Sequence, residues 1–228
     1  MFTLFNGNWS DTLYIFCIRA FIAVTVLPIH EWAHGYVAYR MGDDTAKRLG
    51  RLSLNPLRHL DPIGAVALVF TGIGWAKPVP INPNNFQKRK LGMALSALAG
   101  PMSNFLIAVI GVVLLKISGM IMYDNHVYYT DAGKIIREIL SIVIQVNISL
   151  AVFNLLPIPP LDGSRLASYF LPEKTYFGIM KYERIFMLAL MIALFMGYLD
   201  RPLEIITDAA IRFLDIITYP IDWIYKML

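Results

Sequence analysis

A five-residue motif in the first apolar segment has the side chains and the spacing of a site that activates water. The motif reads HEWAH and places His30 and His34 four positions apart, with Glu31 next to His30. On a helix the two imidazoles lie on one face, about one turn apart, and can bind a single Zn²⁺ ion. Zinc lowers the pKa of its bound water, and Glu31 can accept the proton. The motif therefore predicts metal-assisted hydrolysis, with Glu31 as general base.

The elements that must position this motif are long apolar segments. The chain has 228 residues, of which 57% are hydrophobic and only 16% are charged, a balance that argues against an ordinary soluble domain. Its single cysteine excludes an intramolecular disulfide and a cysteine zinc cluster. Since about 20 residues cross a bilayer, four segments qualify as spans: 12–39, 91–118, 135–157 and 183–199.

A further segment, 203–219, repeats charged residues at helical spacing opposite apolar ones, and it is predicted to lie at the membrane interface. The expected fold is an all-α polytopic membrane protein with four to five transmembrane or interfacial helices.

Lysine and arginine gather in two connections, the one between the first two spans and the one between the third and fourth. Residues 1–11 contain neither, and the loop 119–133 carries acids but no base. The positive-inside rule therefore predicts an external N-terminus and cytosolic polar connections. The net charge of +4 indicates topology rather than a nucleic-acid partner. From a span end near Arg40, the motif would lie roughly 9 to 15 Å into the membrane, near the cytosolic side.

Residues 63–81, between the first two spans, are apolar but are too short, and too often interrupted by glycine and proline, for a spanning helix. Their β-branched content predicts a small membrane-embedded β hairpin. Irregular backbone at that depth must be buried in protein or line a wet cavity. We expect an edge of this hairpin to pair with an extended substrate.

A catalytic zinc ion usually has three protein ligands and one water, so the motif lacks one ligand. The candidates are His59, His126 and a carboxylate. The segment NLLPIPPLDG, which ends at Gly163, has three prolines that stop a helix and a glycine that permits a turn. It presents Asp162 on the cytosolic side, so topology favours Asp162. His126 lies on the opposite side, and His59 is predicted to be a hydrogen-bonding loop residue.

Five stretches of the chain, in this order, resemble one family: HEWAH, NPLRHLDPIG, GWAKPVP, LAGPMSN and NLLPIPPLDG. In combination they resemble the site-2 proteases, which are intramembrane zinc metalloproteases. The resemblance implies that His30, His34 and Asp162 bind Zn²⁺ and that Glu31 is the general base. This agrees with the assignment reached from helix geometry and topology.

The resemblance also implies an architecture. The first three spans would form a catalytic core at about 12–166, followed by C-terminal helices at about 183–228, in a single intramembrane metalloprotease domain over 1–228. The segment 63–81 would hold an extended substrate. No polar block of domain size separates the second and third spans, so the chain is similar to compact prokaryotic members without a PDZ domain or a CBS tail. The expected location is the cell membrane, and the expected partners are the lipid bilayer and transmembrane protein substrates.

Two asparagines are candidate substrate or oxyanion ligands. Asn154 lies just before the proline segment and forms a polar stripe with Asn147. Such an amide either makes an interhelical or capping hydrogen bond or stabilises the charge that develops on the substrate carbonyl. Asn104 either lines the same cavity or belongs to a packing surface of small residues, with Gly100 and Ser103, against the first helix.

These observations predict hydrolysis of peptide bonds in or next to transmembrane segments of other proteins. Two alternatives come from other functional classes. A catalytically idle scaffold of the same fold would not need Glu31 beside the metal. A metal transporter would distribute polar groups through the depth of several spans, whereas here they cluster toward one side.

Overall fold

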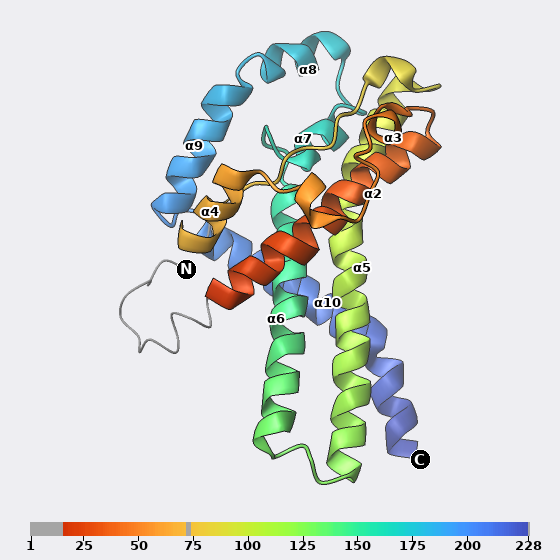
Figure 1. The fold of residues 1–228 in the computed structure, drawn as a ribbon, viewed down its shortest axis with the longest axis vertical. Helices are drawn as coiled ribbons and strands as arrows, with labels where there is room; N and C mark the ends of the chain where they lie inside the picture. Colours follow the sequence, from red (N-terminus) through yellow and green to blue (C-terminus); the bar gives the residue numbers. More distant parts are fainter. Residues whose placement is uncertain (1–15, 72–73, 228) are drawn as a thin grey trace. The chain divides into compact units, whose positions relative to one another are not determined.

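The computed structural model describes residues 16–71 and 74–227, and most of them are helical (Figure 1). In chain order the elements are the π-helix η1 (Ile22–Val26), α2 (Leu27–Arg40), α3 (Thr45–Arg48), the 3-10 helix η2 (Pro56–Arg58), α4 (Pro62–Thr71), the 3-10 helix η3 (Pro83–Asn85), α5 (Arg89–Asp124), α6 (Asp131–Asn154), α7 (Asp162–Ala167), α8 (Glu173–Met180), α9 (Glu183–Phe195) and α10 (Asp200–Met227).

The described residues include three helices that are long and apolar enough to cross a membrane: Phe16–Arg40, Arg89–Asp124 and Asp131–Asn154. They correspond to the first three predicted spans. The fourth predicted span is different. Helix α9 has only 13 residues, about 20 Å, and α10 follows it after a bend of 86°, so the two together make at most one broken span or a re-entrant loop.

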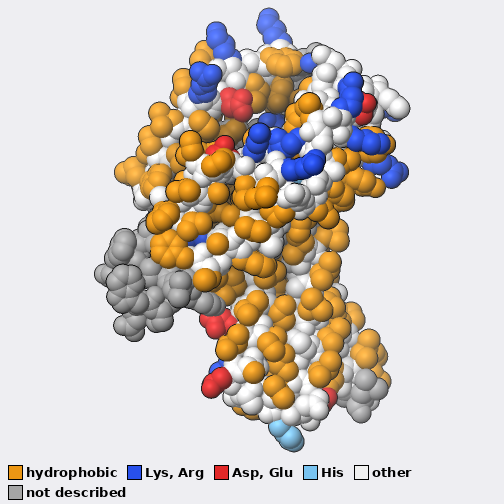
Figure 2. Space-filling model, viewed as in Figure 1, with side chains coloured by type: hydrophobic (Ala, Val, Ile, Leu, Met, Phe, Trp, Pro, Cys, Tyr) orange, Lys and Arg blue, Asp and Glu red, His pale blue; other side chains and the backbone are white. Residues whose placement is uncertain are grey.

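The outer surface also fits a membrane protein. Large apolar side chains recur on one exposed face of α5 at helical spacing: Leu106, Ile110, Leu114, Ile117 and Ile121. Hydrophobic side chains cover much of the visible surface in Figure 2. An exposed apolar stripe of this length would be unfavourable in water but is expected of a helix in lipid.

Two compact units make up the chain, one from residues 1–103 and 155–191 and the other from residues 104–154 and 192–228. In the second unit, α6 lies beside the C-terminal part of α5, and α10 packs against α6 (Figure 1). Their shared core contains Ala108, Val112, Ile144, Ile148 and Leu214. The interfacial position of 203–219 and the single metalloprotease domain stay predictions.

The predicted β hairpin at 63–81 is wrong. Residues 62–71 form the helix α4, and among residues 60–71 and 74–81 the only β contact is the isolated antiparallel bridge between Leu60 and Ala76. Residues 74–81 contain no strand, and apart from the bridge residue Ala76 they have no regular secondary structure. The fold is therefore all-helical over the described residues.

Side chains at both ends of α4 explain this outcome. Asp61 accepts a hydrogen bond from the Gly64 amide at 2.8 Å, and Pro62 occupies the first helical position, where a proline is tolerated. At the other end, the Arg19 guanidinium donates to the Val69 and Phe70 carbonyls at 3.0 and 3.3 Å. The β-branched residues of this segment have only a weak, context-dependent preference for strands, and the two caps outweigh it.

Asp43 joins the end of α2 to the segment that follows residue 81. Its buried carboxylate accepts hydrogen bonds from the Asn82 amide at 2.7 Å, the Asn85 side chain at 2.8 Å and both the amide and the hydroxyl of Thr45. Burial by itself would raise the pKa of Asp43, but these hydrogen bonds outweigh it and hold the pKa below its ordinary value.

We expect Asp43→Asn to lower the free energy of unfolding by about 2 to 4 kcal/mol, because it removes the charge that four donors share. Because the folded-state pKa of Asp43 is depressed, its contribution is complete above the ordinary aspartate pKa of about 3.9 and is lost as the pH falls through the folded-state value. Thermal unfolding in detergent at several pH values measures both effects.

The neighbouring Asp44 supplies the matched control. Its side chain is half exposed and forms an ion pair with Arg48 at 2.8 Å, and a surface ion pair of this kind contributes little to the free energy of unfolding. Asp44→Asn should change stability by less than about 0.5 kcal/mol. Equal melting temperatures for the two variants would contradict the role of Asp43.

Candidate metal centre

Helix α2 places two imidazoles together in the first unit. His30 and His34 are 6% and 7% exposed, and their Nε2 atoms lie 3.0 Å apart. This is the arrangement that four-residue spacing on a helix predicts. The motif therefore forms a pair of buried nitrogen atoms directed at the same point.

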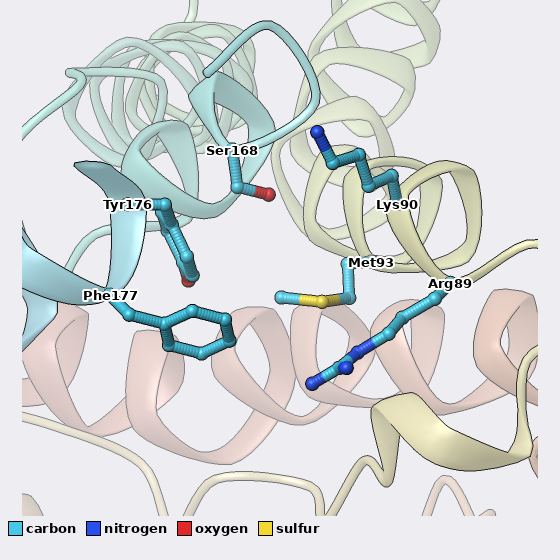
Figure 3. Close-up of a pocket in the computed structure, with 6 residues that line it drawn as sticks. All are labelled: Arg89, Lys90, Met93, Ser168, Tyr176 and Phe177. Carbon is cyan, nitrogen blue, oxygen red and sulfur yellow. The ribbon is translucent and has the colours of Figure 1, made fainter. Parts of the chain in front are cut away.

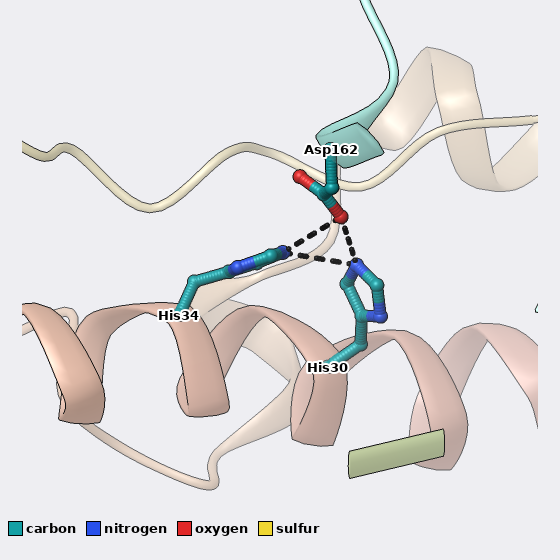
Figure 4. A group of neighbouring side chains, drawn as sticks. All are labelled: His30, His34 and Asp162. Atoms are coloured by element: carbon teal, nitrogen blue, oxygen red, sulfur yellow. Dashed lines mark hydrogen bonds and ion pairs between the residues drawn. The ribbon is translucent and has the colours of Figure 1, made fainter. Parts of the chain in front are cut away.

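Asp162 joins them from α7, of which it is the first residue. Tight backbone turns precede it, with the Ile158 amide donating to the Leu156 carbonyl at 2.8 Å. Gly163 is pressed against this turn so closely that a Cβ there would lie 2.2 Å from the Leu155 carbonyl oxygen. The turn directs the Asp162 carboxylate toward α2, where its Oδ2 lies 3.2 Å from the Nε2 atom of each histidine (Figure 4).

The distances between the three atoms fit a tetrahedral metal site. Ligand atoms bound to zinc at 2.0 to 2.1 Å in a tetrahedron lie about 3.3 Å from one another. The three observed separations are 3.0, 3.2 and 3.2 Å. His30, His34 and Asp162 therefore form one face of such a tetrahedron and could hold a metal ion, with a fourth position left for water.

The surroundings prepare the donor atoms for this role. The Nδ1 atom of His34 lies 2.7 Å from the Ser96 carbonyl oxygen, so a proton on Nδ1 leaves the Nε2 lone pair for a metal. Asp162 lies outside the three long helices. Burial opposes its charge, but hydrogen bonds with His30 and His34 outweigh this and hold the pKa of its carboxyl well below the usual range. Two imidazoles and one carboxylate are a donor set that suits zinc.

Gly100, on α5, makes room for the two imidazoles. A Cβ at this position would lie 2.3 Å from His34 Nε2 and 2.6 Å from His30 Cε1. Part of the predicted small-residue surface of α5 thus packs directly on the histidine pair. A single methyl group would have to displace the proposed ligands.

We expect Gly100→Ala to lower metal affinity by about 10- to 100-fold, the range seen when the support of a metal ligand is disturbed. Metal analysis after dialysis against a metal buffer measures the change. Gly178→Ala is the control, because a Cβ at Gly178 would meet nothing within 4 Å. A Gly100→Ala variant with the affinity of the parent protein would show that the imidazoles do not bind metal in this arrangement.

Glu31 has a partner that sequence reasoning missed. Its Oε2 accepts a hydrogen bond from the Val79 amide at 2.8 Å. The sequence did carry a signal for this contact. Val79 stands between Pro78 and Pro80, which keep the chain extended and have no amide hydrogens, so the Val79 amide is the one backbone donor of this triplet. The Ser96 carbonyl was also missed, and a backbone oxygen 62 residues away has no sequence signature.

Three further candidates from the sequence have neighbours of their own. His59 is fully buried, and its Nε2 lies 2.6 Å from the Ser53 carbonyl oxygen, as predicted for a loop residue. Asn104 is buried, and Asn154 donates to the Leu150 carbonyl one turn earlier at 3.0 Å. Both asparagines belong to the second unit, and their roles toward substrate stay predictions.

A small pocket in the first unit shares no residue with this centre. Its volume is about 20 Å³, room for about one water molecule. The side chains around it come from the start of α5, the end of α7 and α8 (Figure 3): Arg89, Lys90, Met93, Ser168, Tyr176 and Phe177.

Comparisons with known proteins agree with this centre. The family model described as peptidase family M50 matches residues 18–199. The chain is 42% identical over 165 residues to YwhC of Bacillus subtilis (strain 168), covering 70% of this chain and 73% of YwhC. It is 28% identical to Rip2 of Mycolicibacterium smegmatis, covering 60% of this chain and 51% of Rip2. It is 26% identical to Rip2 of Mycobacterium tuberculosis (strain H37Rv), covering 73% of this chain and 63% of Rip2.

All three relatives are named as candidate zinc metalloproteases. The chain spans only about half to two thirds of the two Rip2 proteins. No solved structure matches the chain significantly. The match to the family model covers most of the chain, including the HEWAH motif and Asp162, and the chain therefore belongs to peptidase family M50, the family of the site-2 proteases.

Proposed function

We propose that this protein is an intramembrane zinc metalloprotease that hydrolyses peptide bonds in or next to transmembrane segments of other membrane proteins. One observation carries the proposal: the buried triangle of His30 Nε2, His34 Nε2 and Asp162 Oδ2, with sides of 3.0 to 3.2 Å, whose histidines lie on an apolar helix of spanning length. Buried ionisable groups in such a helix are costly unless they face partners or water, and they usually mark a functional site.

Each residue of the centre has a distinct role in this proposal. His30, His34 and Asp162 would hold the zinc ion, which when bound supplies a water of lowered pKa and polarises the substrate carbonyl. Glu31 accepts the proton of the attacking water and returns it to the leaving amine, the dual task of a general acid and base. Asn154 and Asn104 are the proposed donors to the developing oxyanion.

The proposed substrate is a transmembrane protein segment that unwinds locally. A peptide bond in an intact helix is shielded by its own hydrogen bonds, and freed backbone groups are tolerated at membrane depth only within protein or beside water. The partly exposed Asp162 side chain, at 13%, supports access to such a segment or to water.

The proposed topology has the N-terminus outside and the active site near the cytosolic side. Lysine and arginine side chains of the first unit gather at the end that carries α3 and α8 (Figure 2). This basic end would face the cytosol under the positive-inside rule. The metal centre would then take its water from the cytosol.

Reconstitution tests the function. Purified protein is placed in liposomes with a single-span substrate, and products are mapped by mass spectrometry for the parent protein and for Glu31→Gln. Cleavage within or beside the span by the parent alone supports the proposal. Substrate binding without cleavage by either protein would favour a scaffold, and zinc flux into liposomes without cleavage would favour a transporter.

A further inference from the structure

Residues 77–82, which we name the strap, lie against α2 at Val79 and are fixed at both ends. The Lys77 amide donates to the His59 carbonyl at 2.7 Å, and the Lys77 carbonyl accepts from Arg51 at 2.7 Å. At the other end the Asn82 amide donates to the Asp43 carboxylate at 2.7 Å. The position of the strap over the helix is thus set by contacts outside the metal centre.

The centre of the strap offers one hydrogen-bond donor. Pro78 and Pro80 have no amide hydrogen, so Val79 carries the only backbone donor in this triplet. Pro80 also keeps Val79 extended. That amide donates to Glu31 Oε2 at 2.8 Å. A charge-assisted bond of this length is among the stronger hydrogen bonds in proteins.

The helix surface below is shaped to receive Val79. Gly35 follows Glu31 by one turn on the same face of α2, and a Cβ at Gly35 would lie 2.9 Å from Val79 Cγ1. The Val79 side chain is buried, with 6% exposure. The missing side chain at Gly35 therefore lets the strap approach the helix closely enough for its amide to reach Glu31.

We propose that Val79 is a positioning residue for Glu31: its amide binds one carboxylate oxygen and so fixes the direction in which the other oxygen accepts a proton. The inference rests on the proposed function, because it gives Glu31 the role of general base. The strap acts through Glu31 and binds neither metal nor substrate in this role. Three independent observations support this role of Val79. They are its hydrogen bond with Glu31, the two prolines that flank it, and the absence of a side chain at Gly35.

Removing the amide hydrogen tests the proposal directly. Val79→Pro keeps the strap extended but deletes the donor, whereas Val79→Ala shortens the side chain and keeps the donor. We expect kcat of Val79→Pro to be at least about 10-fold below that of Val79→Ala, with similar KM and metal content, because a misoriented catalytic group costs up to about 100-fold. Equal kcat values for the two variants would overturn the proposal.

A rescue experiment separates positioning from a general loss of structure. Gly35→Ala should lower kcat, because its methyl group would push Val79 Cγ1 and the strap away from α2. The double variant Gly35→Ala with Val79→Ala removes that Cγ1 atom. Its loss of log kcat relative to the parent protein should be at most about half of the loss that Gly35→Ala causes alone. Additive losses in the double variant would contradict the fit between Gly35 and Val79.

A readout without activity distinguishes failure of this inference from failure of the proposed function. Since Pro78 and Pro80 carry no amide hydrogen, deuterium uptake at residues 78–80 reports on Val79 alone. Uptake there should be slow in the parent protein and at least about 10-fold faster in Glu31→Ala, which removes the acceptor. If uptake in Glu31→Ala equalled that in the parent protein, the hydrogen bond between Val79 and Glu31 would be refuted. If uptake were slow in a parent protein that cleaves no substrate, the hydrogen bond would stand and the proposed protease function would be refuted.

Discussion

Glu31→Gln is expected to lower kcat for cleavage of a reconstituted single-span substrate by about 10²- to 10⁴-fold, the usual contribution of a general base. Glutamine has nearly the same shape as glutamate, and its amide oxygen can still accept the Val79 amide hydrogen. It has no basic carboxylate to accept a proton from water. The variant should therefore fold, retain zinc and lose catalysis.

Two measurements on the same samples check this result. Cleavage rates give the loss in kcat, and elemental analysis gives the zinc content, which should equal that of the parent protein. Glu138→Gln is the matched control, because Glu138 is an exposed residue of α6. If Glu31→Gln cleaved as fast as Glu138→Gln, Glu31 would not be the base.

Asp162→Asn should remove most of the bound metal. The Asp162 carboxylate lies 3.2 Å from both histidine nitrogens and is the one anionic group among the three proposed ligands. Asparagine keeps the size of the side chain but loses the charge and one strong donor oxygen. Because disturbing even the support of a ligand costs 10- to 100-fold in metal affinity, we expect loss of a ligand to cost at least about 100-fold.

Metal content and affinity, measured by competition with a chelator, test this expectation, and proteolysis should disappear with the metal. Asp208→Asn is the control, since Asp208 is exposed on α10. An Asp162→Asn variant with full metal content would remove Asp162 from the ligand set. The pair of variants also separates two functions of the centre, because Glu31→Gln should retain metal without turnover and Asp162→Asn should lose both.

Local sequence determined the histidine pair and the long apolar helices. Four-residue spacing on a helix brings His30 and His34 together because helical geometry repeats every 3.6 residues. Hydrophobic length predicted the helices that begin near residues 16, 89 and 131, since bilayer thickness sets the length of a span. Proline and glycine near Asp162 predicted the turn that presents it, and the positive-inside rule predicted that it lies on the side of the histidines.

The tertiary structure decided the features that depend on contacts between distant segments. Residues 62–71 form a helix because Asp61 and the remote Arg19 cap its two ends, whereas β-branched composition alone favoured strands. The 86° bend between α9 and α10 likewise could not be read from hydropathy.

The arrangement around the metal centre was decided in the same way. The Ser96 carbonyl orients His34, the bare α-carbon of Gly100 leaves space for both imidazoles, and the Val79 amide binds Glu31. None of these contacts uses a chemically distinctive side chain. Residue types and their spacing therefore identified the groups that could do chemistry, while the backbone atoms and empty spaces that orient those groups emerge only when the chain is folded.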